Sequence, residues 1–121
     1  MSRSDHERLR DILAALDRCV RFRSHLDSRD GEISAMAFDA ILRNLAVVGE
    51  AARSLSEEVR GHFAEVPWHS IAGLRNVVVH EYFRIESGVI RDVVDSEVAP
   101  LAVAIRHYLG EPTAPSGDTR G

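Results

Sequence analysis

The fold is decided by the stretch Ala35-Met-Ala-Phe-Asp-Ala-Ile-Leu-Arg-Asn-Leu-Ala-Val-Val-Gly-Glu-Ala-Ala-Arg-Ser-Leu55, whose apolar residues recur at helical spacing over about six turns. One apolar side of this expected helix consists of Phe38, Ile41, Leu45, Val48, Ala52 and Leu55. A second apolar strip consists of Met36, Ala40, Val47 and Ala51. A helix that is apolar on two sides usually contacts two bodies. We therefore expect one side to face the chain's own core and the other a second copy of the chain, as in a homodimer.

Polar residues mark the start and the remaining face of this helix. Ser34 is a good N-cap, so the helix is expected to run from about Ala35 to Leu55. Asp39, Arg43 and Glu50 share one face at helical spacing, which is most simply explained by ion pairs along the helix.

The flanking sequence predicts three further helices, at about Ser4–Leu26, Trp68–His80 and Val89–Leu109. Their inward-facing residues are expected to be Leu9, Ile12, Leu13, Leu16, Cys19 and Val20 in the first, Ile71, Leu74 and Val78 in the third, and Ile90, Val94, Val98, Leu101, Ile105 and Leu109 in the last. No segment shows the period of two that marks a half-buried strand. Four helices with short connections predict an all-α fold, an antiparallel four-helix bundle.

The breaks between these segments predict how the chain is divided. Ser56–His62 is expected to be a short polar connection, and Pro100 to kink the last helix rather than end it. Residues 110–121 contain helix breakers and no core residues, which predicts a disordered tail after a single domain over residues 1–109.

Composition excludes several classes of protein. With 45% hydrophobic and 28% charged residues, the 121-residue chain is typical of one globular domain. It has no apolar run of the roughly 20 residues that span a bilayer and no secretory signal, so we expect a cytoplasmic protein. The single Cys19 is expected to be a buried thiol rather than a nucleophile. A net charge of −4 argues against a protein that coats nucleic acid, but allows a local cationic cleft.

Motifs for metal or nucleotide chemistry are absent. The six histidines form no His-Glu-x-x-His pair, and one cysteine cannot build a zinc site. No Gly-rich phosphate loop or nucleophile elbow occurs. We therefore expect neither a metalloenzyme nor a nucleoside triphosphate hydrolase, and no cofactor.

The residues that could carry chemistry lie in the third expected helix. Asn76 and His80 are four apart and share a helical face, whereas Arg75 and His80 are five apart, about 140° around an ideal helix. Tyr82 follows seven residues after Arg75. From spacing alone, the simpler interpretation is a histidine near the negative end of the helix dipole, with Arg and Tyr binding surface carboxylates.

The surrounding sequence favours a functional site, because it resembles the HEPN superfamily. That superfamily's signature is Arg, then Asn, Asp or Glu, then several mostly apolar residues and His. In the similar HepT-like branch the motif becomes Arg-(four residues)-His-x-Tyr, which Arg75, Asn76, His80 and Tyr82 match at every position. The phrases Pro67-Trp68…Ile71…Gly73 and Val48-Gly-Glu-Ala-Ala52 also resemble this branch.

The resemblance implies both an activity and a partner. HepT-like proteins are toxin components of toxin–antitoxin systems, four-helix bundles that dimerise and cleave RNA without metal. By resemblance, Arg75, Asn76 and His80 are the candidate catalytic residues. The partner would be a small MntA-like nucleotidyltransferase antitoxin that uses ATP to attach AMP to Tyr82.

The chemistry of these side chains suits such an activity. Histidine can remove the proton from a ribose 2′-hydroxyl near neutral pH, while arginine stabilises the negative charge that gathers on the phosphoryl oxygens. Asn76 is expected to orient His80 or a phosphate. The hydroxyl of Tyr82 is expected close to Arg75, where an added phosphodiester could pair with the guanidinium.

Two alternatives remain open. The chain could be a non-catalytic HEPN subunit that binds and assists a nucleotidyltransferase, or an inert helical dimer. The presence of both Arg75 and His80 favours the enzyme, because a purely binding subunit does not need the pair.

Overall fold

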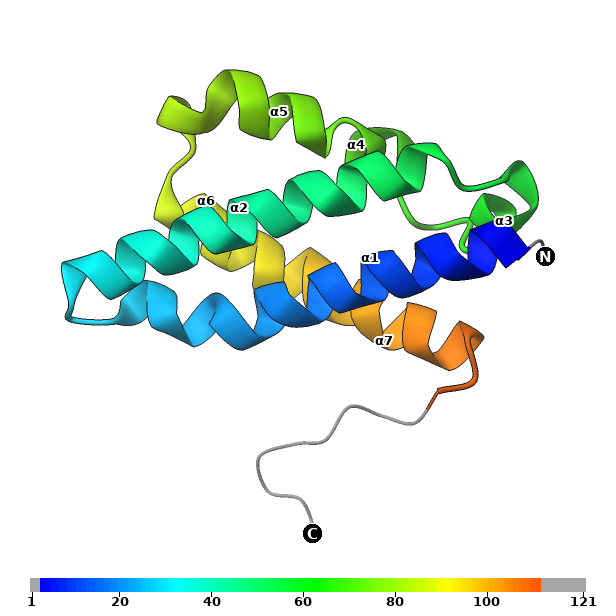
Figure 1. Ribbon diagram of the computed structural model, residues 1–121, viewed down its shortest axis with the longest axis horizontal. Helices are drawn as coiled ribbons and strands as arrows, with labels where there is room; N and C mark the ends of the chain where they lie inside the picture. The colour runs from blue at the N-terminus through cyan, green and yellow to red at the C-terminus, as the bar shows by residue number, and fades with distance from the viewer. Residues whose placement is uncertain (1–2, 112–121) are drawn as a thin grey trace, which may run out of the picture.

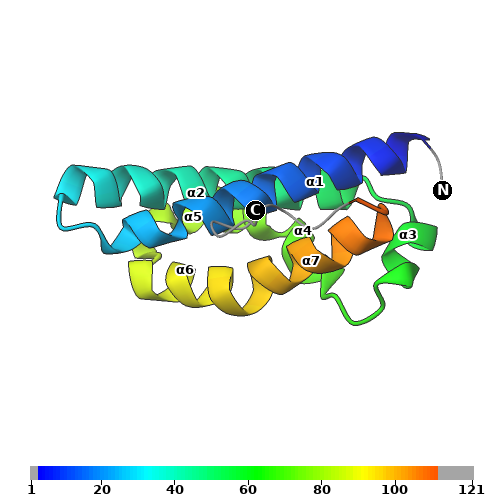
Figure 2. The same ribbon diagram turned by 90° about the horizontal axis from the view of Figure 1, so that it is seen from below.

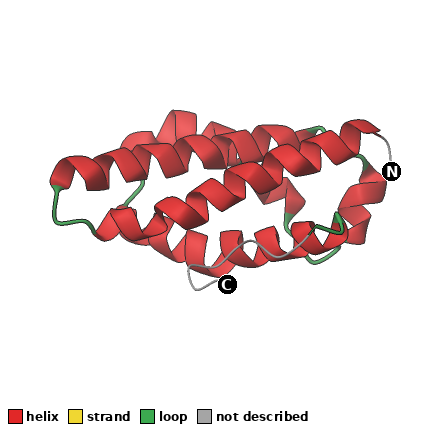
Figure 3. Ribbon diagram, turned by 60° about the horizontal axis from the view of Figure 1, so that its bottom comes forward, coloured by secondary structure: helices red, strands yellow, loops and turns green. Residues whose placement is uncertain are grey.

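The computed structural model describes residues 3–111, and every regular element within that range is a helix (Figures 1 and 3). In chain order the elements are α1 (Arg3–Phe22), a 3-10 helix (Arg23–Asp27), α2 (Gly31–Arg53), α3 (Glu57–His62), α4 (Trp68–Ala72), α5 (Leu74–Glu81), a 3-10 helix (Tyr82–Arg84), α6 (Ser87–Val93), a π-helix (Val94–Val98) and α7 (Ala99–Tyr108). The all-α prediction is confirmed. Most of the expected tail, residues 112–121, lies outside the described residues, and the division at residue 109 stays a prediction.

The core lies where α1, α2 and the segment from the π-helix to α7 meet. Figure 1 shows α1 and α2 running side by side in opposite directions, and Figure 2 shows α6 and α7 along one side of this pair. The largest fully buried side chains are Leu9, Ile12, Leu16, Ile41, Leu42, Ile105, Val48, Val59, Val94 and Cys19. The expected inward sides of the first, second and last helices are therefore largely confirmed. Val20 differs, since it is 42% exposed.

The third expected helix is broken into α4 and α5 at Gly73. Gly73 is the C-cap of α4 and the N-cap of α5, and its amide donates to the carbonyls of His69 and Ser70, at 3.2 and 3.1 Å. Both short helices pack mainly against α2, at the edge of the bundle (Figure 1). Ile71, Leu74 and Val78 are consequently only half-buried, and α5 contains no fully buried residue. The expected burial of this segment is overestimated, because one neighbouring helix cannot enclose it.

Two helix starts differ from expectation. The N-cap of α2 is Asp30, whose carboxylate accepts from the amides of Glu32 and Ile33 at 2.9 and 3.4 Å. Ser34 instead donates its hydroxyl to the carbonyl of Leu26 at 2.9 Å, so its expected role as the cap is wrong. A carboxylate four residues earlier satisfies the free amides of the first turn equally well.

The expected connection after α2 also contains a helix. Ser56 accepts a hydrogen bond from the amide of Val59 at 3.2 Å and caps α3. The Ser56 amide in turn donates to the buried carboxylate of Asp5 at 3.0 Å, which ties this turn to the start of α1.

The last helix is interrupted by the π-helix Val94–Val98, which ends two residues before Pro100, and its direction changes there (Figure 2). Proline has no amide hydrogen, and its ring would clash with the carbonyl four residues earlier. A wider turn relieves that clash and lets the helix continue, in keeping with the expected kink.

Ion pairs connect α1 and the 3-10 helix after it to the π-helix and α7. The Arg23 guanidinium binds both carboxylate oxygens of Asp95, at 3.0 and 2.9 Å, and Asp27 at 2.9 Å. These contacts lower the pKa of Asp95 and of Asp27. Arg106 on α7 pairs with Asp17 on α1.

Over residues 3–111, no helix has both the length and the apolar character needed to cross a membrane.

Candidate functional site

The segment that carries Arg75, Asn76 and His80 is anchored at its start by Trp68. The indole of Trp68 is buried and donates to the carbonyl of Arg60 at 3.1 Å, which connects α4 to α3. Its ring meets that of Phe63 edge-on, with centroids 6.0 Å apart. These contacts fix where α4 begins.

Gly49 lets α5 approach α2 closely. A Cβ atom added at Gly49 would lie 2.8 Å from the carbonyl oxygen of Ile71, 3.0 Å from the amide nitrogen of Arg75 and 3.2 Å from the Cβ of Leu74. Two of these three atoms belong to the backbone, which cannot move aside as a flexible side chain can. A glycine on α2 therefore sets how closely the first turn of α5, which contains Arg75, approaches α2.

Arg75 projects from the outer side of α5. Its side chain is 51% exposed, its Nε lies 3.9 Å from a carboxylate oxygen of Glu50, and its Nη1 lies 3.5 Å from Oδ1 of Asn76. Both contacts are long for a guanidinium, and an exposed ion pair such as the one with Glu50 contributes at most about 1 kcal/mol. The guanidinium can therefore exchange these partners for a phosphate at little cost.

His80 lies in the last turn of α5 and is exposed. Within the described range, no side chain or backbone group hydrogen-bonds to its imidazole, and nothing joins it directly to Arg75. The structure thus brings Arg75 and Asn76 into contact, and leaves His80 on the shared helix without a direct link to them.

Tyr82 stands apart from Arg75. Its hydroxyl donates to Oδ1 of Asp39 on α2 at 2.5 Å, and this hydrogen bond raises the pKa of Tyr82. The half-buried Tyr82 ring meets that of Phe38 edge-on, with centroids 6.1 Å apart. The expectation that the phenolic oxygen lies close to Arg75 is not met in this conformation, because Asp39 holds it elsewhere.

The charged residues of α2 contact α5 and the turn after it, rather than pairing along their own helix. Glu50 faces Arg75 at one end of α5, and Asp39 binds Tyr82 at the other. The expected ion pairs among Asp39, Arg43 and Glu50 are absent from the described residues. Sequence reasoning noticed these carboxylates but assigned them the wrong partners, because helical spacing carries no information about contacts between helices.

Sequence reasoning also missed two exposed apolar side chains that flank His80. Val79 is 55% exposed and Phe83 is 97% exposed. The Phe83 ring lies edge-on to that of Tyr82, with centroids 5.1 Å apart. Large apolar groups in open solvent beside a candidate site often mark a surface that another molecule covers.

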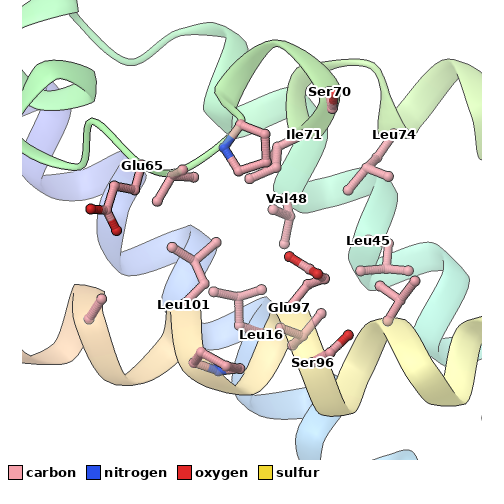
Figure 4. A pocket seen from close by; sticks show the side chains of 16 residues that line it. Leu16, Leu45, Val48, Glu65, Ser70, Ile71, Leu74, Ser96, Glu97 and Leu101 are labelled. Atoms are coloured by element: carbon pink, nitrogen blue, oxygen red, sulfur yellow. The ribbon is translucent and has the colours of Figure 1, made fainter.

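The structure also contains an apolar pocket of about 570 Å³ among α1, α2, α4, α5 and the π-helix to α7 (Figure 4). Its labelled residues include Leu16, Val48, Ile71 and Leu101, with Glu97 pointing inward. None of Arg75, Asn76, His80 or Tyr82 lines it. Leu74 does, so the inner side of α5 faces this pocket while its outer side carries the candidate residues.

Two other classes of site find no support in the described part of the chain. No group of three His, Cys, Asp or Glu side chains there could hold a metal ion. Cys19 is fully buried, which confirms the prediction of a buried thiol, and burial raises its thiol pKa to about 12.

Comparison with known proteins identifies the family. A sequence model of the family described as "Ribonuclease HepT-like" matches residues 12–108. "Putative RNase MJ1380" of Methanocaldococcus jannaschii is 32% identical over 93 residues, covering 77% of this chain and 85% of that protein. "Putative RNase TTE0752" of Caldanaerobacter subterraneus subsp. tengcongensis is 34% identical over 70 residues, covering 58% and 62%. "Probable ribonuclease HepT" of Thermococcus cleftensis is 26% identical over 101 residues, covering 84% and 92%.

No solved structure matches this chain. The family match spans most of the sequence and includes α5 with Arg75, Asn76 and His80. The predicted resemblance is confirmed, and the chain belongs to the HepT-like ribonuclease family of the HEPN superfamily.

Proposed function

We propose that this chain is the toxin of a toxin–antitoxin system and cleaves RNA without a metal ion, with Arg75, Asn76 and His80 at the reacting phosphate. The observation that carries the proposal is that the fold makes little use of these side chains. Arg75 makes only long polar contacts, and His80 makes no hydrogen bond or ion pair among residues 3–111. An exposed helix in a family of ribonucleases thus presents a cation and an imidazole that are free to act on a substrate.

In the proposed reaction the 2′-hydroxyl oxygen attacks the adjacent phosphorus while an imidazole removes its proton. The bond from phosphorus to the 5′-oxygen breaks, which leaves a 2′,3′-cyclic phosphate and a 5′-hydroxyl. Arg75 stabilises the charge on the phosphoryl oxygens as it builds up. Asn76, in the same turn as Arg75, orients His80 or the phosphate.

A homodimer would bring two copies of this site to one cleft. One imidazole could then act as the base while the other protonates the leaving oxygen. The exposed Met36 and the half-buried Ala40, Val47 and Ala51 on α2 support a second subunit. Sedimentation at micromolar concentration should show a dimer, and a stable monomer would remove the composite cleft.

The cleavage test compares matched single substitutions on a defined RNA. His80→Ala and Arg75→Ala should each lower cleavage by about 10²–10⁴-fold, while His69→Ala, which removes another exposed histidine from the neighbouring α4, should not. Cleavage should persist in EDTA and leave cyclic phosphate ends. Full activity of His80→Ala, or its loss in EDTA, would refute the assignment.

The proposed antitoxin is an MntA-like nucleotidyltransferase that transfers AMP from ATP to Tyr82. Tyr82 is two residues from His80, and the exposed Val79 and Phe83 offer an apolar surface beside it. Incubation with such an enzyme and ATP should add AMP units to the wild-type chain and none to Tyr82→Phe, measured by intact mass. Modification of Tyr82→Phe would place the acceptor elsewhere.

A further inference from the structure

The hydroxyl of Tyr82 is held by a residue from a distant part of the sequence. Asp39 on α2 accepts its hydrogen bond at 2.5 Å, across 43 positions. The ring is held as well, because that of the partly buried Phe38 on α2 meets it edge-on at 6.1 Å between centroids. The phenolic oxygen therefore has a defined position and a defined hydrogen-bond partner before any other molecule arrives.

We propose that Asp39 is the catalytic base for AMP transfer to Tyr82, fixing the phenolic oxygen and accepting its proton. This inference rests on the proposed function, in which Tyr82 receives AMP. It assigns to the toxin chain itself a group that acts directly on the attacking atom.

The step balances with ATP as the only co-reactant. The Tyr82 oxygen forms a bond to the α-phosphorus of ATP as the bond from that phosphorus to the β-bridging oxygen breaks. Pyrophosphate leaves with the electron pair. The proton of the Tyr82 hydroxyl passes along the existing hydrogen bond to Oδ1 of Asp39, which then releases it to water.

A base is needed because Tyr82 enters the reaction as a neutral phenol. The hydrogen bond to Asp39 is the main reason that the pKa of Tyr82 is raised above its ordinary value of 10.0, and desolvation by burial is the next. A neutral phenol is a weak nucleophile, and it becomes acidic only as its oxygen bonds to phosphorus. The group that accepts the proton must already be within hydrogen-bond reach at that moment.

Nearby alternatives fit the role less well. Glu81, next to Tyr82 in the sequence, pairs with Arg84 at 3.5 Å. Among residues 3–111, Asp39 is the hydrogen-bond partner that the structure gives to the Tyr82 hydroxyl. Asp39 itself is exposed, so a proton that it accepts can reach solvent directly.

The test uses the full chain, an MntA-like nucleotidyltransferase and ATP, with AMP incorporation followed by intact mass at several toxin concentrations. Asp39→Asn keeps the size of the side chain and an oxygen that can accept from Tyr82, but it cannot take the proton. Its maximal rate of transfer should fall by about 10²–10⁴-fold, with an unchanged half-saturating concentration. Glu32→Gln, which neutralises another exposed carboxylate of α2, should behave as wild type.

Each result supports or overturns the inference. Wild-type transfer to Asp39→Asn overturns it, and so does a change confined to the half-saturating concentration, which would make Asp39 a docking contact. Asp39→Glu, which restores a carboxylate on a longer arm, should recover part of the rate, and this variant also decides the matter if Asp39→Asn folds poorly. The two proposals fail in different ways. AMP found on Tyr82→Phe would refute Tyr82 as the acceptor. If Tyr82→Phe gains no AMP but Asp39→Asn is modified at the wild-type rate, only the role of Asp39 as the base is refuted.

Discussion

Replacing Gly49 by alanine should displace the helix that carries Arg75. The new methyl group would lie 2.8 Å from the carbonyl oxygen of Ile71 and 3.0 Å from the amide nitrogen of Arg75. Neither backbone atom can give way without moving the junction of α4 and α5. Gly61, inside α3, is the matched control, because a methyl group there would meet nothing within 4 Å.

The two substitutions are expected to change the free energy of unfolding in opposite directions and by different amounts. Alanine is favoured over glycine in a helix by about 1 kcal/mol, and Gly61→Ala should gain up to that amount. At Gly49 the same gain is opposed by overpacking, which typically costs about 1–3 kcal/mol, and rigid backbone neighbours place this cost at the upper end. Gly49→Ala should therefore lose about 1–2 kcal/mol, or roughly 4–8 °C in Tm for a domain of this size.

Thermal unfolding followed by circular dichroism gives the first measurement, and cleavage of a defined RNA well below Tm gives the second. Gly49→Ala should cleave more slowly than its folded fraction explains, because the amide of Arg75 is one of the displaced atoms. A rise in Tm similar to that of Gly61→Ala would refute the reasoning. It would mean that α5 can move away from α2 at no cost.

Three further predictions follow from local contacts. Asp30→Ala should cost about 1 kcal/mol in urea unfolding, because two amides at the start of α2 lose their cap, and a change below about 0.3 kcal/mol would contradict this. Cys19 should resist alkylation at pH 8 until urea is added, since its raised pKa of about 12 keeps the thiol protonated, and rapid labelling of the folded chain would contradict its burial. Arg23→Gln should destabilise the protein at pH 7, and the difference from wild type should shrink as the pH falls below about 4. Arg23 lowers the pKa of Asp27 and of Asp95 in the folded protein below the ordinary value of 3.8. The stability that Arg23 contributes is therefore present above pH 3.8 and is lost as the two carboxylates become protonated. A difference from wild type that does not change with pH would exclude this cause.

Periodicity predicts the core well where a helix is enclosed on several sides. Leu9, Leu16, Ile41 and Ile105 are all almost completely buried, as expected. The spacing rule fails for α5, because an apolar stripe shows which side turns inward but not how many neighbours cover it. Leu74 and Val78 in α5, like Ile71 in α4, are therefore only half-buried.

Local boundaries are harder to predict because several residues compete for one role. Asp30 and Ser34 are both suitable caps, and only the path of the chain from Leu26 onward decides between them. Gly73 carries no signal that separates a tolerated helical glycine from a helix end. The start of α3 could have been anticipated, since Ser56 followed by acidic residues is a common helix start.

The candidate site, too, could be predicted only in part from the sequence. The motif indicated Arg75, Asn76, His80 and Tyr82, and the structure places the first three on one exposed helix. Their partners, Glu50 and Asp39, come from α2 and are joined to the motif only by tertiary structure. A sequence motif can name the reacting groups, but not the side chains from other helices that contact them.

The absence of any fully buried residue in α5, and its packing mainly against α2, has a consequence for dynamics. Helices of this kind open by local unfolding, at a free energy well below that of the whole domain. Backbone amides of α5 should therefore exchange with deuterium sooner than those of α1 and α2, and at a rate insensitive to changes in global stability. The α1–α2 pair stays folded while this segment opens, so the motion is confined to the helix that carries Arg75, Asn76 and His80.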